Sequence, residues 1–571
     1  MERKRIAVGT DNFKAIIDSN GYYVDKTLYI KQILNEYVIG RTNLTMRPRR
    51  FGKTLLLSTL RYFLDIDEKE NAYLFKDLAI SKETKLCEKY QNKYPVIFFT
   101  LKEVKGRTEE EFIKSFNKQL NSEYRRHRYI ETVIEEGCDK ESFNKILLGK
   151  GEVDDFKTYL STLMQGLYNY HHIRPIVLID EYDVPLNKAH EEGLFEYVVE
   201  IISSMFSNGL KTNENLEFAI ITGCLQIAKN QIFTGFNNPS INAVTDVSYA
   251  HYFGFTKAET KELLTYYNLD GRYKDVLECY DGYHIGSCEL INPFSLLCFV
   301  EKAVIDNTIA CSFYWANSSG DALLRKMLKS ISGKADLKKD FESLLSGDVI
   351  KVDVNTTVTY DTMIDNKEAI MGTLLFSGYL TRAEEPTLAD GAEVGESKLT
   401  YMSSWVKIPN NEVLFCFNTI VKEFNKDLSD EKLPVIIKAF LEKDIITAED
   451  YLNKLYSSIL QARDKNSKES NYHYFLAAIL ALNPVEGWKY RSQDQGWQGY
   501  SDFVLVGNRT AIIIEEKNIS SYKEIDKATA EAFKQIKDTD YEARYEKMEY
   551  TILKYAIVYC KHEAFISLEG K

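Results

Sequence analysis

Four short apolar runs in the first part of the chain predict strands that are buried on both faces. The runs are 43–46, 95–100, 175–180 and 216–222. Their hydrophobicity is continuous rather than alternating, which is typical of parallel strands that lie under helices. Stretches with helical spacing, such as 55–64 and 195–206, lie between the runs. This order predicts a doubly wound α/β domain with a parallel sheet, which we expect to span residues 1–255.

The first run leads into a segment with phosphate-handling residues, 47–54, which reads RPRRFGKT. In such folds, ligands bind beyond the carboxyl ends of the strands. A P-loop cradles phosphates with backbone N–H groups, while its lysine neutralises phosphate oxygens and its hydroxyl holds magnesium. Gly52, Lys53 and Thr54 fit these roles and would open the following helix. A chance occurrence of this tripeptide at a strand-to-helix junction is the alternative.

The loop departs from the pattern GxxxxGK[ST] at its start. Arg47 stands where the pattern has its first glycine, and the following Pro48 has no N–H to donate. The loop must therefore have a different shape. We expect Arg49 and Arg50 to supply positive charge where backbone donors are missing.

The third and fourth runs end in residues that could complete a nucleotide site. Asp180 and Glu181 resemble the end of a Walker B strand, where the aspartate holds magnesium through water and the glutamate orients the attacking water. Two surface acids at a strand end are the alternative. The fourth run ends in Thr222-Gly223, where a polar side chain could sense the γ-phosphate, although an ordinary turn fits as well.

A second chemical pattern lies near the C-terminus. Residues 501–506 and 511–517 predict two strands that are joined by a turn at Gly507-Asn508. An ordinary hairpin with an exposed charged end is one interpretation. The other is a metal site, because the acidic residues of the two strands can meet on one face.

Alternation along the second strand places Glu515 and Lys517 on one face and Glu516 on the other. Asp502 can reach the Glu515 face from the neighbouring strand. Two carboxylates about 4 Å apart repel by roughly 4 kcal/mol at an effective dielectric constant of about 20, so they usually need a cation. Magnesium prefers such ligands and keeps waters, one of which can attack a phosphodiester with the help of Lys517.

Length, composition and charge limit the classes of protein that fit. The 571 residues exceed a single hydrophobic core, and 44% hydrophobic with 27% charged residues is ordinary for a soluble globular chain. A formal net charge of −12 excludes a generally basic coat, so nucleic-acid binding must use a local groove. The basic, aromatic segment 124–129 could be a strand-binding surface, and a solvated helix face is the alternative.

Disulfide, zinc and membrane signals are weak. The nine cysteines are scattered and never spaced CxxC, so we interpret them as reduced cytosolic thiols. The eight histidines include no HExxH, which argues against a histidine-rich zinc enzyme. The chain has neither an apolar run of about twenty residues nor the apolar core of a signal peptide. We therefore expect a cytoplasmic protein with no membrane partner.

Several motifs together resemble one family. They are 23–27, 47–54, 178–183, 236–238, 253–256, 280–283, 292–295, 377–381 and 409–410. Over nearly its whole length the chain is similar to AAA-ATPase-like proteins of bacteria and archaea that carry a C-terminal PD-(D/E)XK nuclease domain. This family shares the missing first glycine, so Arg47 is not peculiar to this chain. The resemblance implies ATP and Mg²⁺ as cofactors and nucleic acid as a partner.

The resemblance also implies roles near the C-terminus. Such nucleases have a helix with a glutamate before the first strand, and Glu469, followed by 472–473, fits that place. Gln535-Ile536 and Tyr541 match the helix that follows the catalytic lysine. Glu516 replaces a residue that is usually apolar, so the choice of its neighbour as the metal ligand rests on alternation.

The segment between the two patterned ends, 256–462, predicts amphipathic helices with short strand-like pieces such as 372–376. We interpret it as a helical lid and connecting domain with an exposed hairpin or loop at 387–397. The C-terminal domain, expected at 463–571, would have a restriction-endonuclease-like α/β fold.

We therefore expect a protein that binds and hydrolyses ATP and cleaves nucleic acid, with DNA ahead of RNA as the substrate. Nucleotide state would move the middle domain and so license cutting, which would suit defence or mobile-element functions. One alternative is a nucleotide-controlled binding or scaffold protein with an inactive nuclease fold. Another is an ATPase that remodels a partner. A homo-oligomer is expected only by analogy with P-loop ATPases that complete their sites in trans.

Overall fold

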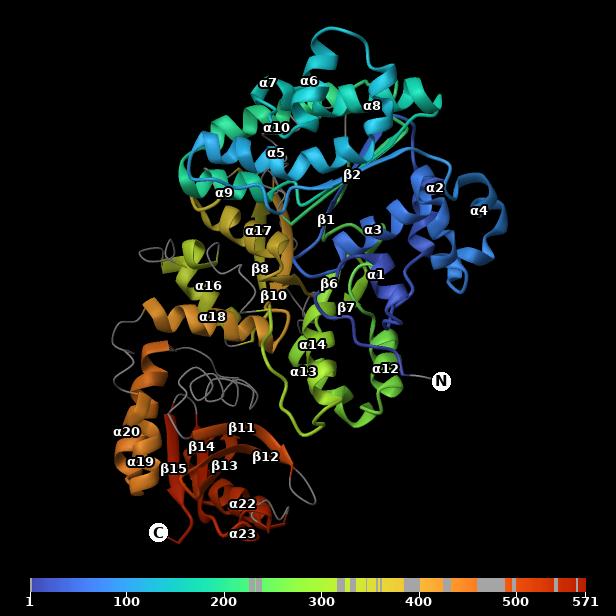
Figure 1. Ribbon diagram of the computed structural model, residues 1–571. Coiled ribbons are helices and arrows are strands. Elements are labelled where there is room, and N and C mark those ends of the chain that lie inside the picture. Colours follow the sequence, from blue (N-terminus) through green and yellow to red (C-terminus); the bar gives the residue numbers. More distant parts are fainter. Residues whose placement is uncertain are drawn as a thin grey trace, which may run out of the picture.

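The computed structural model arranges the chain in three successive parts. The described residues are 3–224, 232, 239–315, 324–328, 335–345, 347–355, 358–359, 362–384, 401–424, 433–459, 488–495, 500–538, 543–560 and 563–570. One sheet lies at each end of the molecule, and a mostly helical part lies between them (Figure 1). No helix within these ranges is long and apolar enough to cross a bilayer.

A parallel sheet with the strand order β2-β3-β4-β1-β5 forms the N-terminal part. The strands are β1 (Arg41–Met46), β2 (Val96–Thr100), β3 (Ile176–Asp180), β4 (Phe218–Gly223) and β5 (Ser240–Asn242). The helices are α1 (Phe13–Asp18), α2 (Leu28–Glu36), α3 (Lys53–Leu64), α4 (Thr84–Tyr90), α5 (Glu109–Arg126), α6 (Cys138–Leu147), α7 (Val153–Lys157), α8 (Tyr159–His171), α9 (Val184–Glu192) and α10 (Phe195–Leu210). The helices α1 to α4 lie on one face of the sheet and α5 to α10 on the other (Figure 1). The predicted doubly wound parallel sheet is confirmed.

The central strands of this sheet are covered on both faces. Every residue of β3 and β4 is buried, and residues 176–179 have no exposed surface. Full burial of one large aliphatic side chain contributes about 1.5–3 kcal/mol, so these runs are strong determinants of the sheet. Because the strands are parallel, the polar residues that follow them meet at one edge.

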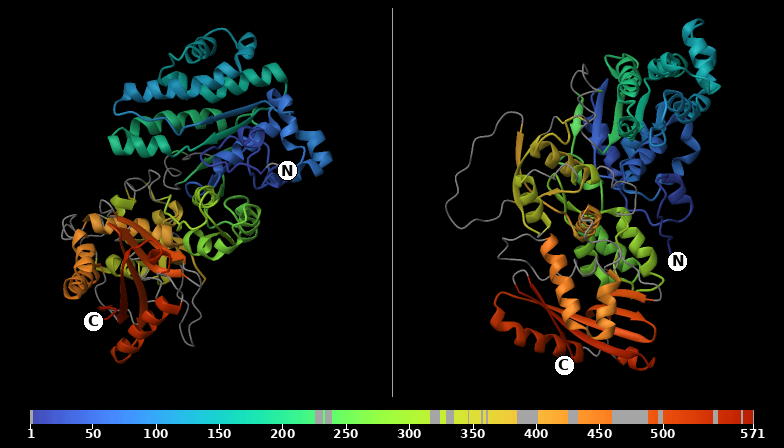
Figure 2. Two further views of the ribbon diagram at one scale, coloured as in Figure 1. Left: turned by 60° about the horizontal axis from the view of Figure 1, so that its bottom comes forward. Right: turned by 90° about the vertical axis from the view of Figure 1, so that its left-hand side faces the viewer.

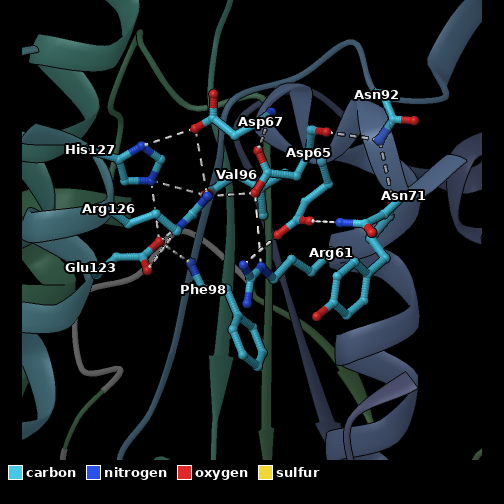
Figure 3. A network of polar contacts seen from close by, with 12 residues as sticks. Arg61, Asp65, Asp67, Asn71, Asn92, Val96, Phe98, Glu123, Arg126 and His127 are labelled. Carbon is cyan, nitrogen blue, oxygen red and sulfur yellow. Dashed lines mark hydrogen bonds and ion pairs between the residues drawn. The ribbon is translucent and has the colours of Figure 1, made fainter. Parts of the chain in front are cut away.

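Side chains at the end of α5, and His127 directly after it, protect the outer edge of β2, the first strand of the sheet (Figure 3). The Glu123 carboxylate accepts the backbone N–H of Phe98 at 2.8 Å. The Arg126 guanidinium and the His127 ring contact the carbonyl oxygen of Val96. These groups occupy the places that a further strand would take, so this part of the edge cannot pair with another chain.

The same network limits both interpretations of the basic segment 124–129, in which Arg125 and Arg128 remain exposed. Tyr124 and His127 have no exposed surface. Arg126 Nη1 lies 2.6 Å from Asp65 Oδ2, in an ion pair whose carboxylate is also fully buried. The segment is therefore not a simple solvated helix face, and these three side chains are not available to bind a nucleic-acid strand.

The middle part is mostly helical. Its elements are α12 (Lys257–Tyr266), α13 (Tyr273–Tyr280), β6 (Tyr283–Ile285), β7 (Cys288–Leu290), α14 (Pro293–Ala303), α16 (Ala335–Leu345), β8 (Ile350–Asn355), α17 (Lys367–Ser377), β9 (Thr381–Arg382), β10 (Tyr401–Lys407) and α18 (Asn411–Phe424). The strands β8, β10 and β9 form a small antiparallel sheet, and β6 pairs with β7.

One prediction for this part is wrong, because the strand-like piece 372–376 lies within the helix α17. All residues from 369 to 377 are buried. A helix that is covered all round has no polar face, so its short apolar run cannot be distinguished from a buried strand by periodicity. The loop that we expected at 387–397 lies outside the described residues.

A mixed sheet with the order β11-β12-β13-β14-β15 forms the C-terminal part. Its strands and helices are α19 (Leu433–Glu442), α20 (Ile445–Ile459), β11 (Trp488–Gln495), β12 (Tyr500–Gly507), β13 (Thr510–Ile519), α22 (Ile525–Asp538), α23 (Ala543–Glu546), β14 (Thr551–Cys560) and β15 (Glu563–Leu568). In this sheet only β13 and β14 pair in parallel, and α22 and α23 lie between them in the chain. Asn508 and Arg509, both with positive φ, form the turn between β12 and β13, one position later than expected. The predicted α/β fold of this part is confirmed.

Both faces of the C-terminal sheet are covered by helices, α19 and α20 on one side and α22 on the other (Figure 2). Phe440 and Leu452 share a core with Ile512 of β13. On the other side, Ile536 of α22 packs in a cluster with Ile513. Successive residues of β13 therefore face different helices, which fixes the register of its polar end.

Candidate functional site

A cavity of about 1020 Å³ lies at the carboxyl edge of the N-terminal sheet. Its wall includes the start of α3, residues 52–54, and Glu181, which follows β3. Lys102 after β2 and Cys224 after β4 also line the cavity, and the middle part contributes Phe294 of α14. Residues from separate strand ends and from two parts of the chain thus meet in one place.

The ammonium group of Lys53 is held by the loop that precedes it. Its Nζ donates to the carbonyl oxygens of Arg47 at 2.9 Å and Pro48 at 3.0 Å, and lies 3.2 Å from Cys224 Sγ. Burial alone would lower the pKa of Lys53, but the nearby Cys224 and Glu181 side chains outweigh burial and hold this pKa above its usual value. Lys53 is therefore a cation at the cavity wall, where it can neutralise phosphate oxygens.

Asp180 connects the end of β3 with two neighbouring elements. Its Oδ2 accepts the hydroxyl of Thr54 at 2.7 Å, and its Oδ1 accepts the hydroxyl of Thr222 at 2.6 Å. Burial raises the pKa of Asp180, although the two hydroxyl donors oppose the shift. A hydroxyl and a carboxylate oxygen thus lie together beside Lys53. Thr54 lines the cavity, whereas Asp180 has no exposed surface and does not, so Asp180 would reach a magnesium ion that accompanies a bound nucleotide only through water.

The residues beyond the ends of β3 and β4 differ from our expectation. Thr222 is buried against Asp180 and does not line the cavity, so it is not placed to sense a γ-phosphate. Asp183 and Cys224, which we did not predict, line the cavity instead. Asp183 Oδ2 accepts the backbone N–H of Cys224 at 3.0 Å. In the sequence, only their position a few residues beyond the third and fourth apolar runs could have indicated that they lie at the cavity.

Glu181 adopts an unusual backbone conformation at the cavity wall. Its φ of 52° lies in the left-handed region, which non-glycine residues seldom adopt. Burial and the adjacent Asp180 carboxylate raise the pKa of Glu181, while Lys53 and Lys102 lower it. A carboxylate with a raised pKa is suited to accept a proton from a water molecule.

Arg47 explains how the loop can begin without glycine. Its guanidinium is fully buried and donates to the carbonyl oxygens of Asn242 at 2.8 Å and Ala243 at 2.9 Å. It also lies 4.8 Å from the centre of the Phe253 ring. Burial lowers the pKa of Arg47 to about 10, so the side chain remains charged at neutral pH. Arg47 thus ties the loop to the end of β5 and the residue after it, and it does not line the cavity.

The other two loop arginines line the cavity. Burial alone would lower the pKa of Arg49, but the Cys224 and Asp183 side chains hold it above its usual value. Arg50 is exposed, and its guanidinium lies 4.5 Å from the centre of the Phe294 ring. Both arginines add positive charge to the cavity wall beside Lys53, which favours a polyanionic ligand.

Two predicted nuclease residues meet on one face of β13. Lys517 Nζ lies 3.2 Å from Glu515 Oε1 and donates to Gln535 Oε1 of α22 at 2.8 Å. Glu515 is 1% exposed, whereas 20% of the Lys517 side chain remains accessible. Glu516 lies on the opposite face, where the Tyr559 hydroxyl donates to its Oε1 at 2.7 Å. The pair on the α22 face therefore combines a buried carboxylate with an accessible ammonium group.

The other two predicted nuclease residues are described less fully. Asp502 belongs to β12, whose pairing with β13 ends at Phe503 and Ile514. The same register continued by one position would set Asp502 opposite Glu515. The side chain of Asp502 and the whole of Glu469 lie outside the described part of the chain. Within that part, no group of three or more histidine, cysteine, aspartate or glutamate side chains could hold a metal. A magnesium site needs fewer protein ligands, because the ion keeps several waters.

Comparisons with known proteins agree with this arrangement. Residues 7–233 match the family model described as predicted AAA-ATPase, and residues 467–569 match the model of the PD-(D/E)XK nuclease superfamily. The chain is also 22% identical over 566 residues to the "Uncharacterized protein in vnfD 5'region" of Azotobacter chroococcum mcd 1. This alignment covers 95% of this chain and 94% of that relative. The two thus align along almost their full lengths. The chain carries an AAA-ATPase-like domain at its N-terminus and a PD-(D/E)XK nuclease superfamily domain at its C-terminus.

Proposed function

We propose that the N-terminal cavity binds ATP with Mg²⁺ and hydrolyses it. The hydrogen bond between Thr54 and Asp180 carries this proposal, because it brings two oxygen ligands together beside Lys53. Lys53 and the two loop arginines would neutralise the phosphates. Glu181 would accept a proton from the attacking water. Magnesium, when bound, would offset negative charge on the phosphate oxygens.

Binding and hydrolysis of ATP by the wild type, Lys53→Ala and Glu181→Gln test this half of the proposal. We expect Lys53→Ala to lose ATP binding. Glu181→Gln should still bind ATP but hydrolyse it on the order of 10²-fold more slowly, the usual minimum for losing a general base. A wild-type protein that neither binds nor hydrolyses ATP would refute the assignment.

The C-terminal domain would cleave phosphodiester bonds of nucleic acid with the help of Mg²⁺. The contact between Lys517 and Glu515, together with the match to a nuclease superfamily, supports this proposal. Asp502 and Glu515 would hold the metal, and Lys517 would orient the attacking water or offset charge that develops on the phosphate. Glu469 would assist. We expect DNA ahead of RNA as the substrate.

Labelled single- and double-stranded DNA and RNA, incubated with Mg²⁺ or Mn²⁺, would test the nuclease assignment. We expect the wild type to cut at least one of these substrates and both Asp502→Ala and Lys517→Ala to lose this activity. Cutting that survives in Asp502→Ala would point to a contaminating nuclease. Failure of the wild type to cut any substrate would contradict the proposal.

The two sites would act together, with nucleotide binding moving the middle part and thereby licensing cutting, as in a defence or mobile-element function. A second candidate is a nucleotide-controlled binding or scaffold protein whose nuclease fold does not cut. One observation favours it, since Lys53 donates to carbonyl oxygens of its own loop. Association with nucleic acid that depends on ATP but leads to no cleavage would support this candidate. We expect a cytoplasmic location and, by analogy alone, a homo-oligomer.

A further inference from the structure

The loop between β1 and α3 packs against the middle part of the chain. The Phe51 ring lies 4.9 Å from the Tyr283 ring in an edge-to-face arrangement. Gly378, which ends α17, approaches Pro48 so closely that a Cβ on this glycine would lie 2.7 Å from Pro48 Cβ. The shape of the loop between β1 and α3 and the position of the middle part are therefore linked by direct contact.

Arg50 occupies a strained position in this loop. Its φ is 69°, in a region that glycine adopts freely and that other residues avoid. Its side chain is exposed and lines the cavity, with the guanidinium over the Phe294 ring. Residues held in such conformations cluster at functional sites. The combination of this backbone conformation with a place on the cavity wall makes the Arg50 guanidinium a candidate for a functional role.

Hydrogen bonds hold the backbone at the start of α14, which carries Phe294. Asn292 Oδ1 accepts the backbone N–H of Phe294 at 3.0 Å and that of Ser295 at 3.3 Å. The Ser295 hydroxyl donates to the buried carboxylate of Glu412, on α18, at 2.7 Å. The ring is thus anchored to the middle part and faces the cavity that the P-loop forms.

We infer that Phe294 is a positioning residue that aims Arg50 at the phosphates of bound ATP. Stacking uses the flat face of the guanidinium and leaves the N–H groups in its plane free to donate to phosphate oxygens. The inference rests on the proposed ATP site and adds that a residue of the middle part completes it. Because Phe294 acts through the charge of Arg50, its contribution to affinity increases with the number of phosphates on the ligand.

The affinities of the full-length protein for Mg-ATP, Mg-ADP and AMP, measured by titration calorimetry, test this inference. Phe294→Leu should weaken ATP binding about two- to five-fold, as expected for an exposed cation–π contact, and leave AMP binding unchanged. Phe294→Tyr should keep wild-type affinity. Arg50→Gly should weaken ATP binding by about ten-fold or more, because charged hydrogen bonds are lost. Its melting temperature should not fall, because glycine relieves the strained φ.

The double variant Arg50→Gly/Phe294→Leu shows whether Phe294 acts through Arg50, and it should bind ATP no more weakly than Arg50→Gly alone. Tyr90→Leu is a matched control, because it removes a contact of 4.7 Å with Lys89 on α4, away from the cavity. It should bind ATP like the wild type. Equal losses for AMP and ATP in Phe294→Leu, or additive losses in the double variant, would overturn the inference and leave the ATP site standing. A wild type that does not bind ATP would overturn the proposed function itself.

Discussion

The hydroxyl of Thr54 donates to Oδ2 of Asp180 at 2.7 Å and so joins the first turn of α3 to the end of β3. Thr222 donates to the other oxygen of the same carboxylate at 2.6 Å. Asp180 is fully buried, and of the two threonines only Thr54 lines the cavity. The two hydroxyls therefore allow a structural contribution to be separated from a role in binding magnesium.

Thr54→Val and Thr222→Val should have similar effects on stability and different effects on activity. Each substitution removes one hydrogen bond to a buried carboxylate, which should lower the free energy of unfolding by about 1.5–3 kcal/mol. Only Thr54→Val should abolish Mg²⁺-dependent release of phosphate from ATP. Urea denaturation and a phosphate-release assay measure the two effects. Equal loss of hydrolysis in both variants would argue against magnesium binding by Thr54.

Arg47→Gly, which restores the glycine of the usual P-loop pattern, should destabilise the protein. The guanidinium donates to the carbonyl oxygens of Asn242 and Ala243, and the substitution leaves these buried acceptors without that donor. We expect the free energy of unfolding to fall by at least about 3 kcal/mol. Arg41→Gly at the exposed start of β1 is the matched control and should cost about 1 kcal/mol or less. A more stable or unchanged Arg47→Gly variant would contradict the structural role.

Arg126→Met should destabilise the edge of the N-terminal sheet. It removes the partner of the buried Asp65 and Glu123 carboxylates, and breaking a buried ion pair on one side typically costs about 3–5 kcal/mol. The adjacent Arg125→Met lies on the exposed face of α5 and should change stability by no more than about 0.5 kcal/mol. Chemical denaturation compares the two variants. Similar stabilities would show that the network in Figure 3 contributes little.

Glu412 should make stability depend on pH in the acidic range. Burial raises its pKa to about 7 from an ordinary value of 4.5, although the Trp315 N–H and the Ser295 hydroxyl oppose the shift. The folded chain thus keeps a proton that the unfolded chain releases, so this group's contribution to the free energy of unfolding falls as pH rises from about 4.5 to about 7. The decrease should be about 3 kcal/mol.

Glu412→Gln tests this dependence, because glutamine keeps an acceptor and cannot ionise. The free energy of unfolding, measured by urea denaturation between about pH 4.5 and pH 7, should decrease less steeply in this variant than in the wild type. Glu442→Gln, at the exposed end of α19, should behave like the wild type. An identical pH profile for wild type and Glu412→Gln would show that the folded protein does not hold this proton.

Much of the fold follows from local patterns of hydrophobicity. The parallel strands were predictable because β3 and β4 are buried along their whole length, so their apolar runs are continuous. The arrangement at the end of β13 was also predictable, because strand alternation alone separates Glu515 from Glu516. The start of α3 at Gly52, Lys53 and Thr54 was also predictable, because the junction between loop and helix has a short, specific sequence.

The remaining features depend on partners that are distant in sequence. From the sequence alone, Arg126 is expected to be a surface residue, because its partner Asp65 comes 61 residues earlier in the chain. From the sequence alone, Arg47 is only a departure from the glycine of the P-loop pattern, because its acceptor Asn242 lies 195 residues later. The role of Phe294 at the cavity likewise becomes visible only when the middle part is placed against the loop.

The packing of α19 and α20 also bears on where the C-terminal domain begins. We expected this domain at residue 463, but both helices share a core with its sheet. We propose that the domain includes residues 433–459. Expression of a fragment that begins before α19, compared with one that begins at residue 463, would test the boundary. The shorter fragment should leave Ile512 and its neighbours uncovered and should aggregate or fail to fold.

Cleavage of end-labelled DNA and RNA by the wild type, Glu515→Gln and Glu516→Gln, with Mg²⁺ and with or without ATP, tests the two-site account most directly. Both substitutions neutralise a buried carboxylate on β13, but only Glu515 contacts Lys517. The account predicts that Glu515→Gln cuts at least on the order of 10²-fold more slowly, that Glu516→Gln retains activity, and that ATP changes the wild-type rate. Equal activity of the two variants, or no cutting by the wild type, would contradict it.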